Sequence, residues 1–203
     1  MDDTRLLVEK AQNKDLAAFE ELVQLYQNKV YALCVHLAGN HADAQDLAQE
    51  AMIRAYRSLG SFRNEADFGT WVHRITVNIW LNLRRKNSKR VIVSLDDPYV
   101  NDSGSEMRRE VADEARDPLR ELEDKEFRAL VRSALGDLSE EHKAVLVLRE
   151  IEGYSYEEVA RMLGCSLGTV KSRLSRARAM MRRRMSDLAR EAGESLPGIQ
   201  ERR

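Results

Sequence analysis

The stretch from Gly153 to Met180 constrains the fold more than any other, because it carries start and stop signals for two successive helices. Ser155 and Glu158 have the spacing of a capping box, in which hydroxyl and carboxylate satisfy free amides at a helix start. Gly164 ends this helix, since glycine adopts a left-handed conformation at little cost, and Ser166 can cap the next. Two short helices joined by a glycine-containing turn predict a helix-turn-helix.

The second of these helices is strongly basic. Residues 161–190 include nine basic side chains and a single acid, whereas Val170 and Leu174 recur four apart and mark the buried side. An ordinary helical hairpin with a charged outer face does not need this asymmetry, so we expect the helix to enter the major groove of duplex DNA. The residues expected to contact the duplex are Thr169, Lys171, Ser172, Arg173, Ser175 and Arg176. Arg176 is the expected reader of a guanine edge.

The composition predicts a folded, mostly helical protein. The chain of 203 residues is 43% hydrophobic and 33% charged, with few glycines and prolines, and its net charge of -1 hides segments of opposite sign. An acidic N-terminus without a long apolar run predicts a cytoplasmic protein with no membrane insertion. Two cysteines and four scattered histidines predict neither a disulfide framework nor a metal site, and no cofactor is expected.

Two amphipathic helices are predicted near the N-terminus. Apolar residues recur at three- and four-residue steps over residues 16–37, Gly39 and Asn40 end that helix, and a second follows over about residues 42–59. The outer side of the second helix carries Asp46, Gln49, Glu50 and Ile53. Such a face is either a solvated surface with one stray apolar residue or a docking face for another protein, and spacing alone leaves both readings open.

A loop over residues 61–70 and a helix over about residues 71–86 combine aromatic and basic residues. Single-stranded nucleic acid is bound by this combination, because cations neutralise phosphates while unstacked bases lie on ring faces. The residues expected to bind it are Phe62, Arg63, Phe68, Trp71, Arg74, Asn78 and Arg85. Tryptophans more often serve a core, however, and basic residues at a helix C-terminus also interact favourably with the helix dipole.

The segment from residue 91 to 122 differs from its surroundings, with two of the three prolines, many acids and little apolar periodicity. It predicts an acidic, flexible linker between two small helical domains at residues 1–90 and 123–188. Residues 189–203 are expected to form a frayed tail. The predicted fold class is all-α.

Three segments in this order resemble the bacterial extracytoplasmic-function sigma factors of the sigma-70 family. They read DAQDLAQEAMIRAYRSLGSFR, FGTWVHRITVNIWLNLRR and LSEEHKAVLVLREIEGYSYEEVARMLGCSLGTVKSRLSRAR. The resemblance covers about residues 16–86 and 123–185 and is specific through the combination of segments. It implies a sigma factor, not an enzyme, that binds core RNA polymerase and directs promoter recognition, DNA melting and transcription initiation.

The resemblance also assigns roles to residues. It implies that Asp46, Gln49, Glu50 and Ile53 bind the clamp coiled coil of the largest polymerase subunit. The helix that begins at Trp71 would recognise the minus-ten element as a single strand, with Asn78 in the pocket that captures a flipped base. The helix-turn-helix would read the minus-thirty-five element as duplex DNA and touch the polymerase flap. The linker would occupy the RNA exit channel, and an anti-sigma factor is a possible further partner.

Two other classes of protein are considered beside this one. A helix-turn-helix regulator would bind a duplex operator and use its N-terminal half to sense a ligand or dimerise, which requires a pocket with convergent polar groups. A nucleic-acid enzyme would need clustered carboxylates for a metal or a nucleophile with its base. The acids of this chain are concentrated in the predicted linker, which offers no regular scaffold for such a centre.

Overall fold

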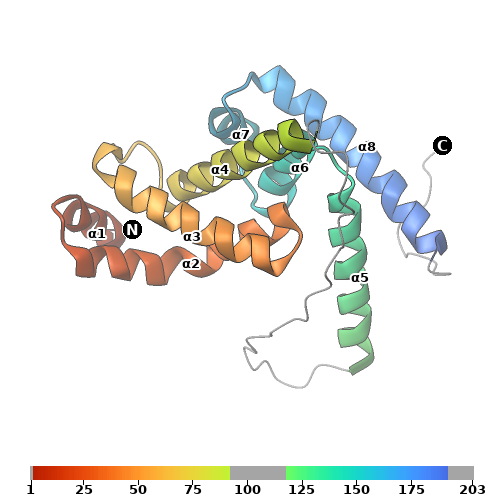
Figure 1. The fold of residues 1–203 in the computed structure, drawn as a ribbon, viewed down its shortest axis with the longest axis horizontal. Helices are drawn as coiled ribbons and strands as arrows, with labels where there is room; N and C mark the ends of the chain where they lie inside the picture. The colour runs from red at the N-terminus through yellow and green to blue at the C-terminus, as the bar shows by residue number, and fades with distance from the viewer. Residues whose placement is uncertain (1, 92–117, 192–203) are drawn as a thin grey trace.

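The computed structural model describes residues 2–91 and 118–191, and all regular secondary structure in these ranges is helical (Figure 1). The all-α prediction is therefore confirmed. The first half, residues 2–91, contains α1 (Asp2–Gln12), α2 (Leu16–Ala38), α3 (His41–Ser58), the 3-10 turn η1 (Leu59–Ser61) and α4 (Phe68–Val91). The second half, residues 118–191, contains α5 (Pro118–Gly136), α6 (Glu140–Leu146), the π-helical turn η2 (Val147–Ile151), α7 (Tyr156–Leu163) and α8 (Leu167–Glu191).

The helix ends follow the capping signals of the sequence. Asp15 accepts a hydrogen bond from the amide of Ala18 at the start of α2, and Ser155 and Glu158 form both bonds of the capping box that opens α7. Gly39 and Gly164 close α2 and α7 with φ of 86° and 61°, in the left-handed region where glycine is favoured. The capping box and the two glycine ends are therefore confirmed, whereas the cap at Asp15 was not predicted.

Small residues set the packing of the first half. Side chains of α3 that face α2 are fully or almost fully buried and mostly alanine, so the two helix backbones approach closely. They meet a row of larger buried residues on α2: Leu22, Val30, Leu33 and Leu37. α4 packs against both helices, and α1 packs against α2. In α1, which the sequence analysis did not predict, Val8 is buried and Gln12 donates side-chain hydrogen bonds to the carbonyls of Leu59 and Phe62.

The second half is built around α8. It contacts α5, α6 and α7, and its buried side consists of Val170, Leu174 and Ala177, as the spacing predicted. α5 begins at Pro118, so its first residues lie within the segment assigned to the linker. Proline is well suited to the first turn of a helix. The rest of the predicted linker, residues 92–117, and residues 192–203 of the predicted tail lie outside the described residues.

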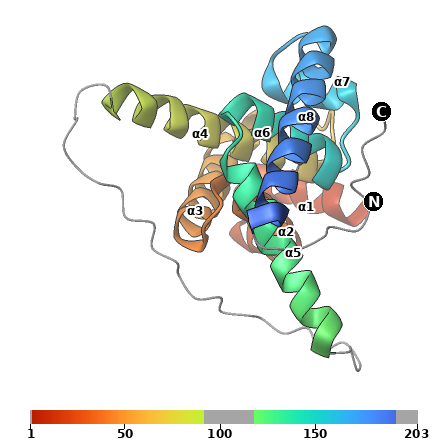
Figure 2. The same ribbon diagram turned by 90° about the vertical axis from the view of Figure 1, so that its right-hand side faces the viewer.

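The two halves pack against each other and share one hydrophobic core. α4 contacts α6 and α7, and α2 contacts η2, so the second half covers one side of α4 (Figures 1 and 2). The sequence predicted two helical parts but gave no sign of this packing, because the contacting residues are far apart along the chain.

Candidate nucleic-acid interface

The N-terminal part of α8 presents a polar and basic face. Ser166 caps the helix by accepting a hydrogen bond from the amide of Thr169 at 3.1 Å. Lys171, Ser172, Ser175 and Arg176 are exposed, whereas Thr169 and Arg173 are half-buried. Because Val170 and Leu174 turn the opposite side into the core, the helix offers its free polar face to solvent. This is the geometry of a recognition helix, whose first turns reach base edges.

Further along α8, two of the basic side chains are already paired within the chain. Arg178 donates to Glu150 at 2.5 Å, and Arg184 donates to Asp137. Arg182 and Arg183 are exposed, and no ion pair of theirs is found in the described part of the chain.

The residues predicted to bind single-stranded DNA, on α4 and in the loop before it, fall into an exposed group and a buried group. Arg74, Asn78 and Arg85 are exposed on its outer side, as is Arg63 in the preceding loop. The rings of Phe62, Phe68 and Trp71 are instead buried, with exposures of 7%, 3% and 8%. The expectation that their faces lie open to bases is not met in this conformation, because the three rings pack on one another with centroids 4.8–6.0 Å apart.

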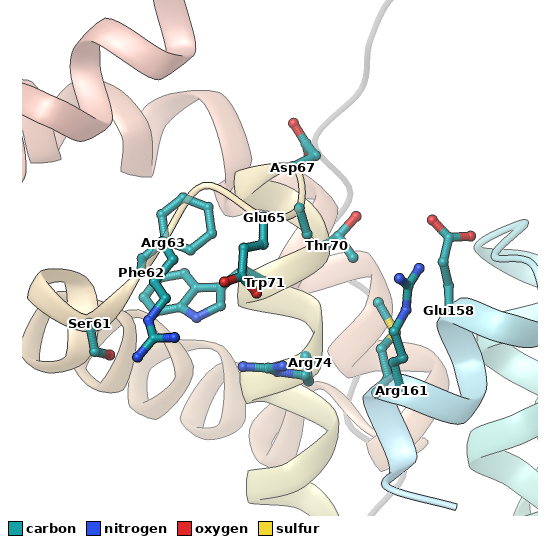
Figure 3. Close-up of a pocket in the computed structure, with 12 residues that line it drawn as sticks. Ser61, Phe62, Arg63, Glu65, Asp67, Thr70, Trp71, Arg74, Glu158 and Arg161 are labelled. Atoms are coloured by element: carbon teal, nitrogen blue, oxygen red, sulfur yellow. The ribbon is translucent and has the colours of Figure 1, made fainter. Parts of the chain in front are cut away.

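A cavity of about 580 Å³ opens between this part of α4 and α7 (Figure 3). Trp71 and Arg74 form its wall on α4, the Ser61–Arg63 segment lies on one side, and Glu158 and Arg161 rise from α7 on the other. The space is therefore lined by both halves of the chain, and it lies where the sequence predicted single-stranded DNA.

The predicted docking face on α3 is present as an exposed surface. Asp46, Gln49 and Ile53 are exposed, Ile53 to 38%, and Glu50 is half-buried and pairs with Arg54 at 3.0 Å. Asp46 and Glu50 also line a groove of about 540 Å³ between α3 and α4. An apolar side chain ringed by polar groups beside a groove is suited to protein docking.

Polar groups buried between the two halves were not predicted. Lys143 of α6 is 6% exposed, and its Nζ donates to the carbonyl oxygen of Leu37 at 3.4 Å. Burial, with nearby Arg84 as a second cause, lowers the pKa of Lys143 to about 8. Tyr154 Oη lies 2.9 Å from His73 Nδ1 across the same contact. Contacts this distant in sequence leave no periodic signal that could have revealed them.

Glu152 lies between two histidines in this contact. Its carboxylate oxygens are 4.0 Å from His36 Nδ1 and 3.9 Å from His73 Nδ1. Burial lowers the pKa of both histidines, that of His73 to about 4, and raises the pKa of Glu152. Both rings are thus neutral near pH 7, and these approaches are not full ion pairs.

Two family models match the chain: sigma-70 region 2 over residues 22–90 and sigma-70 region 4 over residues 128–181. The RNA polymerase sigma-H factor of Pseudomonas aeruginosa is 38% identical over 189 residues, which cover 92% of this chain and 95% of that protein. The ECF RNA polymerase sigma-E factor of Haemophilus influenzae is 36% identical over 185 residues, covering 90% and 95%. This chain belongs to the extracytoplasmic-function sigma factors.

Among solved structures, the sigma factor RpoE of Bartonella quintana in complex with the anti-sigma factor NepR matches with a TM-score of 0.64 and 25% identity. That match covers 83% of this chain and 96% of the other.

The family decides between the classes that the sequence left in competition. As a sigma factor, the chain binds core RNA polymerase and promoter DNA and directs promoter-specific transcription initiation. Sigma factors are initiation factors rather than catalysts. The two matched regions fall in the two halves of the structure, so α3 and α4 lie in region 2 and the helix-turn-helix of α7 and α8 lies in region 4.

Nowhere in residues 2–91 and 118–191 do three or more His, Cys, Asp or Glu side chains gather as a metal site requires. Within the same residues, every helix is too short or too polar to span a bilayer.

Proposed function

We propose that this sigma factor contacts promoter and polymerase through three separate surfaces. The outer face of α3 docks on core polymerase, α4 with its preceding loop holds the minus-ten element as a single strand, and α8 reads the minus-thirty-five element as duplex. The observation that carries the proposal is the capped start of α8, where Lys171 and Arg176 are exposed opposite a buried apolar side.

For polymerase docking, we propose the clamp coiled coil of the largest subunit as the partner of Asp46, Gln49, Glu50 and Ile53. Ile53 supplies apolar area at the centre of the face, and the acidic side chains around it favour a basic partner surface. The ion pair between Glu50 and Arg54 holds the Glu50 carboxylate in one orientation before binding.

For the minus-ten element, the exposed groups provide charge and hydrogen bonds. Arg63, Arg74 and Arg85 neutralise phosphates, and the amide of Asn78 offers both donors and an acceptor to the edge of a captured base. The buried cluster of Phe62, Phe68 and Trp71 supports this surface from beneath. A base stacks on these rings only after the cluster rearranges.

For the minus-thirty-five element, Arg176 contacts a guanine edge, and the other residues of the predicted set contact neighbouring bases or phosphates. The set comprises Thr169, Lys171, Ser172, Arg173 and Ser175. Two of its hydroxyls already have local partners, since Thr169 Oγ1 lies 2.8 Å from Ser166 Oγ and Ser172 donates to the carbonyl of Thr169. We therefore assign the basic members the larger share of DNA binding.

The proposal extends to further partners and to the place of action. A relative of similar fold was solved with an anti-sigma factor, and we propose that a protein of this kind also binds this sigma factor. The second half also touches the polymerase flap, the segment between α4 and α5 enters the RNA exit channel, and the chain acts in the cytoplasm.

The test is a competition for core polymerase followed by run-off transcription on a genomic promoter library. A variant with Asp46→Lys, Glu50→Lys and Ile53→Asp should lose competition while its circular dichroism stays helical. The matched control, Glu20→Lys with Glu21→Lys, reverses two exposed acids on α2 and should compete normally. Equal competition by the triple variant refutes the assignment of α3. Duplex binding by the wild type without any binding to core would favour an operator-binding regulator.

A further inference from the structure

α1 ends against the loop that precedes α4. Its last residue, Gln12, is half-buried, and its side-chain amide nitrogen donates two hydrogen bonds to residues 47 and 50 positions away. The acceptors are the carbonyl oxygens of Leu59, at 3.0 Å, and of Phe62, at 2.7 Å. A primary amide has two N–H donors, so both are used here. A side chain near the start of the protein therefore holds the turn η1 and the entrance of the loop.

The bond to Phe62 fixes the direction in which the chain enters the loop. Because a peptide group is planar, an anchored carbonyl oxygen also fixes the plane of the amide of the next residue, Arg63. The donor is itself held in place by packing, since Val8 and Ala11 of α1 are only 1% and 6% exposed. The amide of Gln12 is thus presented from a packed helix.

The loop has a second anchor at its far end. The carboxylate of Asp67 accepts a hydrogen bond from the amide of Gly69 at 2.8 Å and so caps the start of α4. Between the anchors, Asn64 has φ of 55°, in the left-handed region that asparagine adopts more readily than most residues. The exposed side chains of Arg63 and Glu65 border the cavity of about 580 Å³ beside α4 (Figure 3). The anchors therefore decide where these two side chains lie.

We propose that Gln12 is a positioning residue for minus-ten recognition, which holds the loop before α4 in the shape that selects the captured base. It acts through the carbonyl of Phe62 and touches no DNA itself. This inference rests on the proposed function, in which α4 and this loop hold the minus-ten element as a single strand. A loop shaped in advance loses less conformational freedom when DNA binds, so both the affinity and the choice of base depend on it. α1 thereby becomes part of the machinery that reads the promoter.

The substitution Gln12→Met tests the two hydrogen bonds. Methionine has a similar length but no N–H donor, so the carbonyl of Phe62 loses its anchor while α1 keeps its apolar packing. Asn13→Ala is the matched control, because the side chain of Asn13 donates to the carbonyl of Glu9, in the preceding turn of the same helix. Val8→Ala is a second control, which removes buried apolar contact from α1 but keeps the amide of Gln12.

The shape of the loop is followed with a nitroxide label at Ala66→Cys, an exposed loop position, in the free chain. The background carries Cys165→Ser, and Cys34 is fully buried. Loss of a neutral hydrogen bond changes an equilibrium by about threefold to tenfold. We expect the ratio of mobile to immobile label to rise by about this factor in Gln12→Met and to stay unchanged in Asn13→Ala.

Base selection is measured with the holoenzyme formed from core polymerase and each sigma variant. The holoenzyme is mixed with a pool of single-stranded oligonucleotides of randomised sequence, and the bound fraction is sequenced. Gln12→Met should bind the preferred strands about threefold to tenfold more weakly and should discriminate less among the bases at the captured position. Asn13→Ala and Val8→Ala should keep the base preference of the wild type, and Val8→Ala should do so although it unfolds at a lower urea concentration.

The outcomes separate this inference from the proposed function. If the wild-type holoenzyme shows no base preference in the pool, the proposed role of α4 and its loop fails, and Gln12 has nothing to position. If the wild type selects bases and Gln12→Met selects them equally well, the proposed function stands and this inference is overturned. An unchanged label in Gln12→Met, or an equal loss of preference in Val8→Ala, also overturns it, because α1 would then act through stability alone. A looser loop with a weakened preference, both confined to Gln12→Met, supports the inference.

Discussion

Replacing His73 by glutamine should make the folded chain less sensitive to acid. Burial lowers the pKa of His73 from 6.5 to about 4, and the residue is only 5% exposed. Below pH 6.5, His73 therefore binds a proton in the unfolded chain, whereas in the folded chain it binds one only near pH 4. The stability contributed by the neutral ring is complete above pH 6.5 and is lost as the pH falls. At pH 5 the loss, RT ln[(1+10^1.5)/(1+10^-1)], is about 2 kcal/mol.

The charged groups around His73 come from several elements. Lys29 on α2 lowers its pKa further and Asp67, just before α4, raises it, both by less than burial does. Glu152 and Tyr154 face it from the second half. Because the pKa of Glu152 is raised, its contribution has the opposite sign, present at low pH and lost as the pH rises. Since Glu152 is present in both proteins, a comparison of wild type with variant cancels most of its effect.

The assay is urea unfolding followed by far-ultraviolet circular dichroism at pH 5 and pH 7.5. The wild type should lose about 2 kcal/mol more than His73→Gln between these two pH values. His41→Gln serves as the control, because His41 also bonds to a tyrosine hydroxyl, that of Tyr31 at 2.8 Å, but this pair lies within the first half. An equal loss in wild type and His73→Gln would refute the reasoning that burial keeps this ring neutral.

Three further predictions concern DNA reading and the backbone. Asn78→Ala should impair promoter opening, followed with permanganate, more than binding to an upstream duplex fragment; equal losses would count against a captured base. Arg176→Ala should relax preference at one base pair, a difference of ~1–3 kcal/mol across single-substitution duplexes, whereas Arg183→Ala should weaken all duplexes alike. Gly69→Ala should cost about 1–3 kcal/mol in urea unfolding, because the added Cβ would lie 2.8 Å from a tyrosine ring. Gly60→Ala, with no heavy atom within 4 Å of its added Cβ, should be near neutral.

Local signals made much of the helical framework predictable. The capping box at Ser155, the left-handed glycine at Gly164 and the buried stripe of Val170 and Leu174 each depend on residues within about one turn. Such interactions are encoded in spacing alone, so the exposed basic face of α8 followed from them. The predicted roles of the residues on that face stay predictions.

What depended on tertiary contacts could not be read from spacing. Composition showed that Phe62 and Trp71 lie near basic residues, but not that their rings would pack inward on one another. A lysine is normally assigned to the surface, but the buried Nζ of Lys143 donates a hydrogen bond to the carbonyl oxygen of Leu37, 106 residues away. The pairing of His73 with Tyr154 joins residues 81 positions apart. The shared core was missed for the same reason.

The carboxylates that hold Arg178 and Arg184 change how the charge of α8 acts on DNA. When a free lysine or arginine meets a phosphate, a condensed cation leaves the duplex. For each such contact, log K then falls by about 0.9 for every tenfold rise in salt concentration. An arginine that leaves Glu150 to reach a phosphate exposes a carboxylate that attracts a cation in return. The net release of ions is then smaller than the number of basic side chains would give. We therefore expect the second half to hold duplex DNA with a milder dependence on ionic strength than its sequence suggests.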